Sequence, residues 1–309
     1  MHEHIDLLEV YKIGNKIRLG TNGDGGYVIS DLSGNYDAYI SCGVADEEGF
    51  TRDFLTKYNY LKRDNSFAFD GTINDYPWSY TNDIQFVKKN IDANKNDEKH
   101  TTLTEYMEKY DNIFLNMDIE GAEWEWLNEL DEKYLNKCKQ ITLEFHGLCF
   151  RYDKEWKIPT EKQFKCFKKL KNTHYIIHAH GNTCNFFANG LPNVIELTFV
   201  RKNCFSDIPM FNNEELPSRL DFVNSPGRQE FDLNHYPFRV INPNNQIIIG
   251  PSSFNTKIIA LDKEYNSDTI INFFHRYPDT FSYSFKKNIL SVKRTDSELG
   301  WGQYLIGYL

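Results

Sequence analysis

The chain has 309 residues, with 44 acidic against 35 basic side chains and a formal net charge of −9. This balance argues against a nucleic-acid backbone as partner, and no apolar run approaches the roughly 18 residues of a membrane span. The six cysteines form no Cys-x-x-Cys pair, so neither a disulfide framework nor a zinc knuckle is predicted. The first residues lack the plan of a signal peptide, so we expect a cytoplasmic protein, and a homo-oligomer stays open.

The first predicted element is a hairpin. Asn22–Gly26 separates two short apolar runs, and the Asp-Gly and Gly-Gly pairs inside it are strong turn signals. Three glycines beside Tyr27 would also let the backbone approach a ligand closely. The sequence is compatible with both roles for this segment.

A nucleotide-type unit is predicted next. Ala38–Ala45 predicts a strand that runs into a turn at Gly43, and a helix follows it. The next predicted strand, Ser66–Phe69, ends in Asp70 and Gly71. An acid at the end of the second strand is the position that hydrogen-bonds ribose hydroxyls in such units. The pair of glycine turn and strand-end acid therefore favours a nucleotide-like ligand.

The following stretch is predicted to be less regular. Ile84–Ile91 predicts a third strand, and Asp92–Lys99 predicts a polar loop. Thr102–Glu105 has the residue types of a capping box, which predicts the start of a short helix.

The fourth predicted strand, Ile113–Met117, is the centre of the pattern. Its five residues suit a buried parallel strand, and Asp118, Glu120 and Gly121 follow it before a helix-forming run. This order places two carboxylates at the carboxyl edge of a sheet, where ligands bind in open α/β folds.

Three more strands and one long helix complete the predicted sheet. Gln140–Gly147 and Tyr175–His180 predict the fifth and sixth strands, and Val194–Val200 predicts a seventh that pairs antiparallel with the sixth. Thr160–Gln163 has the pattern of a second capping box. The helix behind it carries three apolar side chains on one face: Phe164, Phe167 and Leu170.

Strands and helices thus alternate through residues 1–204, which predicts an α/β domain with a Rossmann-like seven-stranded sheet and helices on both faces. Residues 205–240 hold four prolines among polar residues and predict a wrapping segment or linker. Residues 241–309 predict a small antiparallel β module of short strands. Its expected strands are Gln246–Gly250, Lys257–Leu261, Thr269–His275, Thr280–Phe285 and Ile289–Lys293.

The carboxyl edge of this sheet is expected to gather seven polar side chains: Asp118, Glu120, Glu144, His146, His178, His180 and Asn182. Side chains alternate between the faces of a strand, so Glu144 and His146 point one way, as do those of the sixth strand. A convergence of carboxylates and imidazoles favours a functional site over isolated core residues. Within the set, Glu144 also fits a purely hydrogen-bonding role, and His178 fits a bystander.

Such a set supports removal of a proton from a weak acid such as a sugar hydroxyl. A histidine of near-neutral pKa, oriented by a carboxylate, can take that proton. Alternatively, Asp118 with His146 or His180 holds a divalent cation that lowers the pKa of the hydroxyl. Mixed carboxylate and imidazole ligands suit Mg²⁺ or Mn²⁺ better than a thiolate zinc site. Both mechanisms stay open on the sequence.

The chain resembles the FkbM-like S-adenosylmethionine-dependent methyltransferases, in a branch of methyltransferase-like proteins, over about residues 10–226. The most specific element is the acidic run after the fourth strand. The residues that carry the resemblance are Asp24-Gly25-Gly26-Tyr27, Asp118-Ile119-Glu120-Gly121-Ala122-Glu123, Glu144-Phe145-His146, His178-Ala179-His180-Gly181-Asn182 and Glu196-Leu197-Thr198-Phe199.

The resemblance implies a seven-stranded methyltransferase sheet that binds S-adenosyl-L-methionine. By resemblance Gly43 and its neighbours bind the methionine portion, Asp70 binds the ribose, and Asp118 lies beside the reactive methyl group. Many methyltransferases carry an acid just before the first-strand glycine, where this chain has Ser41 and Cys42. The expected cofactor-binding set is Tyr27, Ser41, Cys42, Gly43, Asp70, Gly71, Met117 and Asp118.

The expected function is therefore O-methylation of a sugar or sugar nucleotide in surface (capsular) polysaccharide biosynthesis. The expected catalytic residues are Asp118, Glu120, His146 and His180, with Glu144 and Asn182 binding the substrate. The β module looks like modules appended to bacterial surface-glycan enzymes. Its aromatic residues suit either sugar stacking or a small core: Phe273, Phe274, Tyr277, Phe281, Tyr283 and Trp301.

Two alternatives from other classes remain at this point. A metal-dependent hydrolase would use Asp118, His146 and His180 around a cation and would have no affinity for the sulfonium cofactor. A non-catalytic glycan-binding protein would bind sugar through the β module and would show no turnover.

Overall fold

The computed structural model describes residues 6–78, 82–152, 155–157, 160–188 and 190–240, and beyond them six short strands. Of residues 150–157 and of the strands after residue 240 it describes only the backbone.

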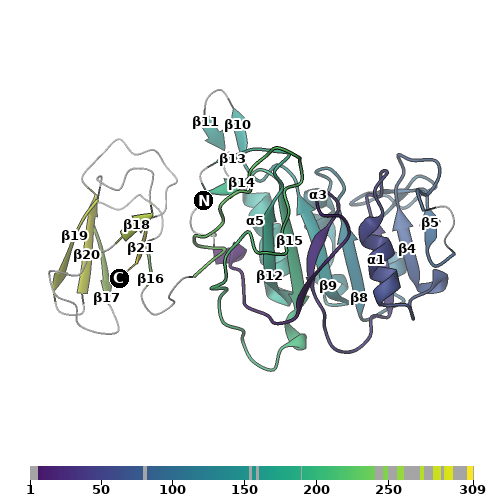
Figure 1. The fold of residues 1–309 in the computed structure, drawn as a ribbon, viewed down its shortest axis with the longest axis horizontal. Coiled ribbons are helices and arrows are strands. Elements are labelled where there is room, and N and C mark those ends of the chain that lie inside the picture. Colours follow the sequence, from purple (N-terminus) through teal and green to yellow (C-terminus); the bar gives the residue numbers. More distant parts are fainter. Residues whose placement is uncertain are drawn as a thin grey trace.

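The centre of the molecule is a seven-stranded sheet in the order β12-β15-β9-β8-β3-β4-β5 (Figure 1). Strand β15 runs antiparallel to both of its neighbours, and every other neighbouring pair in this sheet is parallel. The predicted mixed α/β sheet with a reversed seventh strand is therefore confirmed. Its strands are β3 (Ala38–Cys42), β4 (Ser66–Phe69), β5 (Gln85–Val87), β8 (Ile113–Met117), β9 (Cys138–Phe145), β12 (His174–Gly181) and β15 (Ile195–Arg201).

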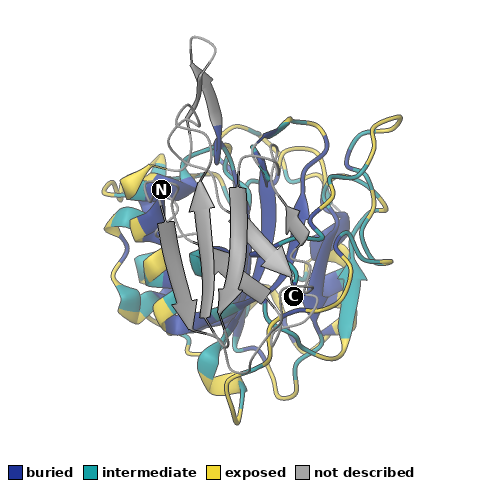
Figure 2. Cartoon of the chain, turned by 90° about the vertical axis from the view of Figure 1, so that its left-hand side faces the viewer, coloured by how far each residue is buried: buried dark blue, intermediate teal, exposed yellow. Residues whose placement is uncertain are grey.

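Helices cover both faces of this sheet, because side chains of each central strand alternate between two cores. In β8, Ile113, Leu115 and Met117 join one cluster of buried side chains, whereas Phe114 joins the other. The first core contains residues of α2 (Thr104–Met107), α3 (Glu123–Glu129), α4 (Glu132–Leu135) and α5 (Glu161–Thr173). The second contains residues of α1 (Gly49–Lys57). Figure 2 shows the buried strands between layers whose outer sides are exposed.

The predicted capping box of α5 is confirmed. The Thr160 hydroxyl accepts from the backbone N–H of Gln163 at 3.3 Å, and the Gln163 side chain accepts from the N–H of Thr160 at 2.6 Å. The apolar face behind it, Phe164, Phe167 and Leu170, is buried as predicted. Each interaction satisfies a backbone donor that the first turn of a helix leaves free.

The other predicted capping box is wrong, although its helix α2 exists. Leu103 precedes this helix in the left-handed region at φ 66°, and Thr102 makes no capping bond. Leu103 is completely buried, and the Thr102 hydroxyl instead pairs with the hydroxyl of Thr104 at 2.8 Å. Burial of the leucine thus decides the local backbone, and the threonine cannot reach the helix terminus.

The predicted third strand, Ile84–Ile91, is divided in the structure. Only β5 (Gln85–Val87) joins the large sheet, and β6 (Asn90–Ile91) pairs in parallel with β7 (His100–Thr101). The backbone turns between them, with the N–H of Lys89 donating to the carbonyl of Val87 at 2.8 Å.

The predicted hairpin is also present and lies over one half of the second face. Strands β1 (Lys16–Leu19) and β2 (Tyr27–Ser30) pair antiparallel around the glycine-rich turn. Two buried polar contacts join it to the sheet: Gln140 Oε1 accepts from Ser30 N at 2.9 Å, and Thr198 Oγ1 donates to the carbonyl of Val28 at 2.6 Å. This half of the sheet surface is polar, in contrast to the aromatic half under α1.

Residues 205–240 contain no helix or sheet strand, and they pack on the sheet. Leu216, Leu233 and Phe238 belong to the first core, and Tyr236 and Val240 are buried. The elements not yet named are short: η2 (Arg63–Asn65), β10 (Phe150–Tyr152), β11 (Glu155–Lys157), β13 (Phe187–Ala188), β14 (Leu191–Pro192) and η3 (Lys202–Cys204).

Beyond residue 240 the strands form two three-stranded antiparallel sheets, β16-β21-β18 and β17-β20-β19. Five of them overlap the predicted runs, and β21 was not predicted. Their bounds are β16 (Gln246–Ile249), β17 (Thr256–Ala260), β18 (Asn272–Phe274), β19 (Phe281–Lys286), β20 (Ile289–Arg294) and β21 (Leu305–Tyr308). The aromatic side chains expected either to stack on sugars or to form a small core are not among those that the structure describes. None of the helices in the described ranges is long and apolar enough to cross a bilayer.

Candidate functional site

The strand order reverses between β3 and β8. From β3 the chain continues to β4 and β5 on one side, and after β5 it returns to β8 and β9 on the other. Gly43 follows β3 at φ +80°, and a Cβ added there would lie 1.5 Å from the backbone oxygen of Asp118, which follows β8. Only glycine fits so close an approach. Ligands of open α/β sheets bind at such a reversal, so this is the place to look for a site.

Asp70 lies beside this reversal but its carboxylate is already occupied. One oxygen accepts from the N–H groups of Val44 and Ala45 at 3.0 and 2.9 Å, and the other from the N–H and hydroxyl of Thr72 at 2.7 and 2.5 Å. Burial alone would raise the pKa of Asp70, but these hydrogen bonds lower it below its ordinary value. A carboxylate accepts about four hydrogen bonds. The expected free acceptor for a ribose is therefore absent, and Asp70 instead holds the Gly43 turn.

The other residues expected to bind the cofactor differ in whether they face a core or the edge of the sheet. The side chains of Cys42 and Met117 are buried in the first core, so only their backbone reaches the edge, and burial raises the pKa of the Cys42 thiol. Ser41 is buried on the other face, and Gly71 packs against the side chain of Asn90. Tyr27 is buried near Glu144 and Asp118; burial first, and then these charges, raise the pKa of its hydroxyl.

The Glu123 carboxylate closes the turn after β8. From the sequence this residue was named only as part of the acidic motif that follows the fourth strand. Glu120 and Gly121 have φ values of +55° and +101°. The Oε1 atom of Glu123 closes this turn by accepting from the N–H of Ile119 at 3.1 Å and of Gly121 at 3.2 Å. The Glu123 side chain is 0% exposed. An acid two residues after a glycine at a strand end is the signal that was available for this residue.

The same Glu123 oxygen lies 3.2 Å from Nδ1 of His146. The other ring nitrogen, Nε2, lies among three carboxylates, at 3.4 Å from Glu120 Oε2, 3.6 Å from Glu144 Oε1 and 3.8 Å from Asp118 Oδ1. We call Asp118, Glu120, Glu144 and His146 the rim. The predicted convergence of these four residues is present.

Electrostatics at the rim favours protonated groups near neutral pH. Burial raises the pKa of Asp118 to about 7, with His146 opposing and Glu120 and Glu123 adding to the shift. Burial likewise raises the pKa of Glu144 well above its ordinary value, helped by the charge of Asp118. Burial lowers the pKa of His146, but the hydrogen bond to Glu123 and the surrounding carboxylates outweigh it and raise the pKa. Asp118 Oδ1 is buried and has no hydrogen-bond partner among the described residues.

His180 does not belong to the rim, which corrects its expected catalytic and metal-binding roles. Its Nδ1 lies 3.0 Å from Glu196 Oε2 and its Nε2 lies 2.9 Å from Glu230 Oε2. Burial lowers the pKa of His180, but these two carboxylates raise it to about 10. An imidazolium with both nitrogens bonded cannot accept a proton at neutral pH, so His180 is a structural cation.

The partner Glu230 comes from a segment that covers the polar half of the sheet, and we call Ser218–Glu230 the strap. His178 is bound in the same way, with its Nε2 2.8 Å from Asp221 Oδ1 of the strap. Burial lowers the pKa of His178, although Asp221 opposes the shift. His178, which was expected to be a bystander, is thus held by Asp221, and neither acid of the strap was predicted.

Two amides connect the strap, the hairpin turn and the rim. Asn182 donates to Glu144 Oε1 at 2.9 Å and to Asp24 Oδ1 at 3.4 Å. Asn224 of the strap donates to Asp24 Oδ1 at 3.1 Å and to Glu196 Oε1 at 2.6 Å. The predicted pair of Glu144 and Asn182 is therefore in contact, and Asp24, Asn224 and Glu196 extend the polar surface toward the strap.

Two groups in the described part of the chain have ligand atoms close enough to hold a metal ion. One comprises Asp118, Glu120 and His146, and the other comprises Asp24, Glu144 and Glu196. The predicted pairing of Asp118 with His146 is present in the first group, whereas the predicted alternative ligand His180 belongs to neither. The reason is that alternation along β12 places His180 on the correct face, but Glu196 and the strap occupy both of its nitrogens.

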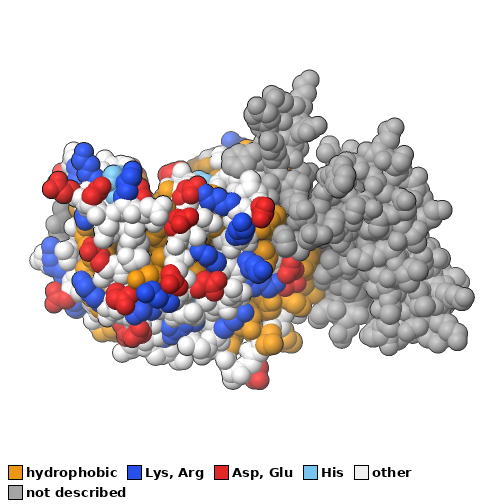
Figure 3. All heavy atoms as spheres, turned by 180° about the vertical axis from the view of Figure 1, so that it is seen from behind, with side chains coloured by type: hydrophobic (Ala, Val, Ile, Leu, Met, Phe, Trp, Pro, Cys, Tyr) orange, Lys and Arg blue, Asp and Glu red, His pale blue; other side chains and the backbone are white. Residues whose placement is uncertain are grey.

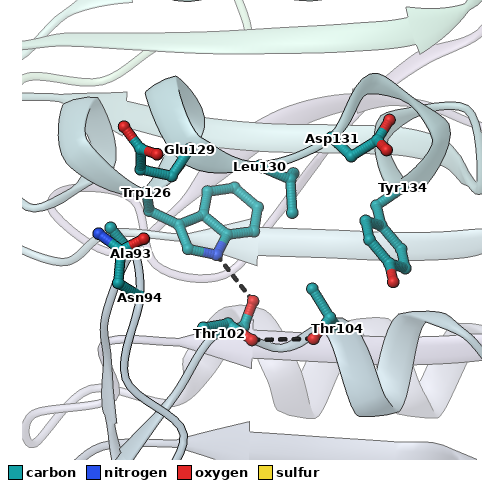
Figure 4. Close-up of a pocket in the computed structure, with 9 residues that line it drawn as sticks. All are labelled: Ala93, Asn94, Thr102, Thr104, Trp126, Glu129, Leu130, Asp131 and Tyr134. Atoms are coloured by element: carbon teal, nitrogen blue, oxygen red, sulfur yellow. Dashed lines mark hydrogen bonds between the residues drawn. The ribbon is translucent and has the colours of Figure 1, made fainter.

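A separate shallow hollow, shown in Figure 4, shares no residue with the rim. Trp126 lies at its centre, with its indole N–H donating to the carbonyl of Thr102 at 3.0 Å. On the coloured part of the surface in Figure 3, acidic and basic side chains are interspersed. Neither feature competes with the sheet edge as a candidate site.

Comparison with known proteins identifies no relative of this chain. No protein-family profile, characterised protein or solved structure matches the chain significantly.

Proposed function

We propose that the chain is an S-adenosylmethionine-dependent O-methyltransferase that acts on a sugar or sugar nucleotide. The observation that carries the proposal is the meeting of the Gly43 turn, Asp118 and His146 at the reversal of strand order. A seven-stranded sheet with its last strand reversed and inserted beside the fifth supports the methyltransferase fold that the resemblance implies. Participation in surface polysaccharide biosynthesis is proposed from the resemblance alone.

The charge of the residues at this edge suits S-adenosylmethionine, which carries a positive charge on its sulfur. Asp118 Oδ1 is a buried acceptor with no partner among the described residues, and it lies where a cationic group would bind. When bound, S-adenosylmethionine would supply an electrophilic methyl group on a positively charged sulfur. Asp118 and the Gly43 turn would hold it, while Asp70 would keep the turn in place through Val44 and Ala45.

His146 is the proposed base for the acceptor hydroxyl. The His146 side chain is 19% exposed, and its Nε2 has no hydrogen-bond partner among the described residues. The proton of the acceptor hydroxyl would move to Nε2 as the hydroxyl oxygen takes up the methyl group that the bound cofactor would supply. Alignment of the two reactants contributes much of the rate gain in such displacements.

A calorimetric titration with S-adenosylhomocysteine tests the proposal. We expect saturable binding to the wild type and weaker binding to Asp118→Asn. The matched control is Glu161→Gln, which removes one charge from an exposed position at the start of α5. Absence of binding to the wild type would overturn the proposal.

A second candidate is a metal-dependent hydrolase, or metal-assisted methyl transfer, because Asp118, Glu120 and His146 can offer three ligand atoms to one cation. Mg²⁺ or Mn²⁺ suits this donor set. Repeating the titration with each cation alone separates the two classes. Tight cation binding without affinity for S-adenosylhomocysteine favours the hydrolase.

A further inference from the structure

We propose that Glu123 is the positioning residue for His146: its carboxylate accepts a hydrogen bond from the Nδ1–H group, and Nε2 is left as the nitrogen that faces the rim. For its catalytic meaning this inference rests on the proposed function. An ionised carboxylate accepts hydrogen bonds and cannot donate them. The contact of 3.2 Å between Glu123 Oε1 and Nδ1 therefore selects the tautomer with its proton on Nδ1.

Glu123 is fixed more firmly than a side chain that only touches a histidine. Its Oε1 also accepts from the backbone of Ile119 and Gly121, and the whole side chain is buried. The next residue of α3, Trp124, donates its indole N–H to the carbonyl of His146 at 2.6 Å. Two consecutive helix residues thus hold the ring and the backbone of His146, and they connect it to the turn that carries Asp118.

Among the described residues, three further carboxylates lie close to the ring, and they face its other nitrogen. Asp118 and Glu120 approach Nε2 from the turn and Glu144 approaches it from β9, at 3.4 to 3.8 Å. None of these contacts is a hydrogen bond in the structure, so the lone pair of Nε2 stays available. When Nε2 takes a proton from a hydroxyl, the resulting imidazolium keeps the Glu123 carboxylate as its counter-charge, as in other acid–histidine pairs.

Nuclear magnetic resonance of protein with ¹⁵N-labelled histidine tests the inference without any ligand. His146→Asn identifies the signals of His146. In the wild type at a pH where the ring is neutral, we expect the proton on Nδ1. A neutral His146 with its proton on Nε2 would overturn the inference before any Glu123 variant is made.

Two variants then test whether Glu123 is the group that sets the tautomer of His146. In Glu123→Gln we expect the tautomer preference to be lost and the pKa of His146 to fall by about one to three units, since an opposite charge at this distance shifts a pKa by that amount. The matched control, Glu120→Gln, removes a charge from the Nε2 side and should keep the tautomer. An unchanged tautomer and pKa in a folded Glu123→Gln protein would contradict the inference.

The result is independent of the proposed function. Failure of S-adenosylhomocysteine to bind would overturn the methyltransferase and leave the tautomer measurement standing. Normal cofactor binding together with the wrong tautomer would overturn only the role of Glu123.

Discussion

The rim and the strap face the same polar edge of the sheet, and both contain a buried acid beside a histidine. In the strap region His180 has a carboxylate on each ring nitrogen, whereas at the rim only Nδ1 of His146 has a hydrogen-bond partner. His180 is thus a fixed cation that ties Glu230 to the sheet. His146 keeps one nitrogen for an incoming group. A free ring nitrogen together with exposure separates the two kinds of histidine: the His146 side chain is 19% exposed, whereas those of His178 and His180 are each 3% exposed.

The largest effect, on the stability of the fold, is expected from removing residues 225–240, which include the end of the strap. A chain that ends at Asn224 loses Glu230 and four buried side chains: Leu233, Tyr236, Phe238 and Val240. Burial of such side chains contributes about 1.5–3 kcal/mol each, so their loss removes roughly 6–12 kcal/mol, comparable with the whole stability of a domain. Urea unfolding followed by circular dichroism should show an unfolded or molten protein. The control chain ends at Val240, keeps these residues and should stay folded. A cooperative transition in the shorter chain would show that residues 225–240 are not part of the core.

At the rim, His146→Asn should lower turnover of any accepted hydroxyl compound by about 10²–10⁴-fold, the usual cost of losing a general base. Affinity for S-adenosylhomocysteine should not change. Because the pKa of His146 is raised above its ordinary value, the wild-type rate should increase with pH until this ring is neutral. The control His100→Asn alters a histidine paired with exposed Asp97 and should keep full activity. Loss of activity with a chelator, restored by Mn²⁺, would point to the metal mechanism instead.

For the strap we predict a pH dependence of the opposite sign, and it concerns stability: the free energy of unfolding should fall as the pH rises. The pKa of His180 is raised to about 10, so its contribution is fully present below the unfolded value of about 6.5 and is lost as the pH rises through about 10. Removing one partner of a buried ion pair costs about 3–5 kcal/mol. The free energy of unfolding should thus fall by this amount in His180→Gln near pH 6.

By pH 10 the wild type and His180→Gln should have become nearly equal in stability. Denaturant unfolding at several pH values measures this narrowing, with His100→Gln as the reference. A difference between wild type and His180→Gln that stays constant from pH 6 to pH 10 would show that His180 is not a charged partner of Glu196 and Glu230.

Strand positions were predictable because burial on both faces leaves short, continuous apolar runs. The predicted bounds of Ser66–Phe69 and Ile113–Met117 agree with β4 and β8. The position of Asp118 and His146 at one edge followed from the same pattern, since parallel strands end together. Alternation along β12 also placed His180 on the correct face.

What covers that face could not be predicted. Asp221 and Glu230, the strap partners of His178 and His180, lie 43 and 50 residues away from them, in a segment without helix or strand and therefore without a periodic pattern. Glu123 was missed for a different reason. An acid in the first turn of a helix has an ordinary explanation in the helix dipole, and only the left-handed turn at Glu120 and Gly121 redirects it toward His146.

The smallest effect is expected at Asp70, which lies beside the reversal of strand order but supports the site through its backbone. Asp70→Ala removes the acceptor that fixes Val44 and Ala45, and it should weaken binding of S-adenosylhomocysteine by about 1–3 kcal/mol. The lowered pKa of Asp70 means that its stabilising bonds are present above its unfolded value of about 3.8 and are lost as the pH falls below it, so the measurement belongs at neutral pH.

Asp92→Ala is the matched control for Asp70, because the Asp92 carboxylate accepts from Asn94 and Lys95 in a comparable turn elsewhere in the chain. It should lower the midpoint of thermal unfolding slightly and leave the calorimetric affinity unchanged. If Asp70→Ala also left the affinity unchanged, the Gly43 turn would not belong to the ligand site. The rim around His146 would then remain as the candidate site. The proposal that the Gly43 turn binds S-adenosylmethionine would have to be abandoned.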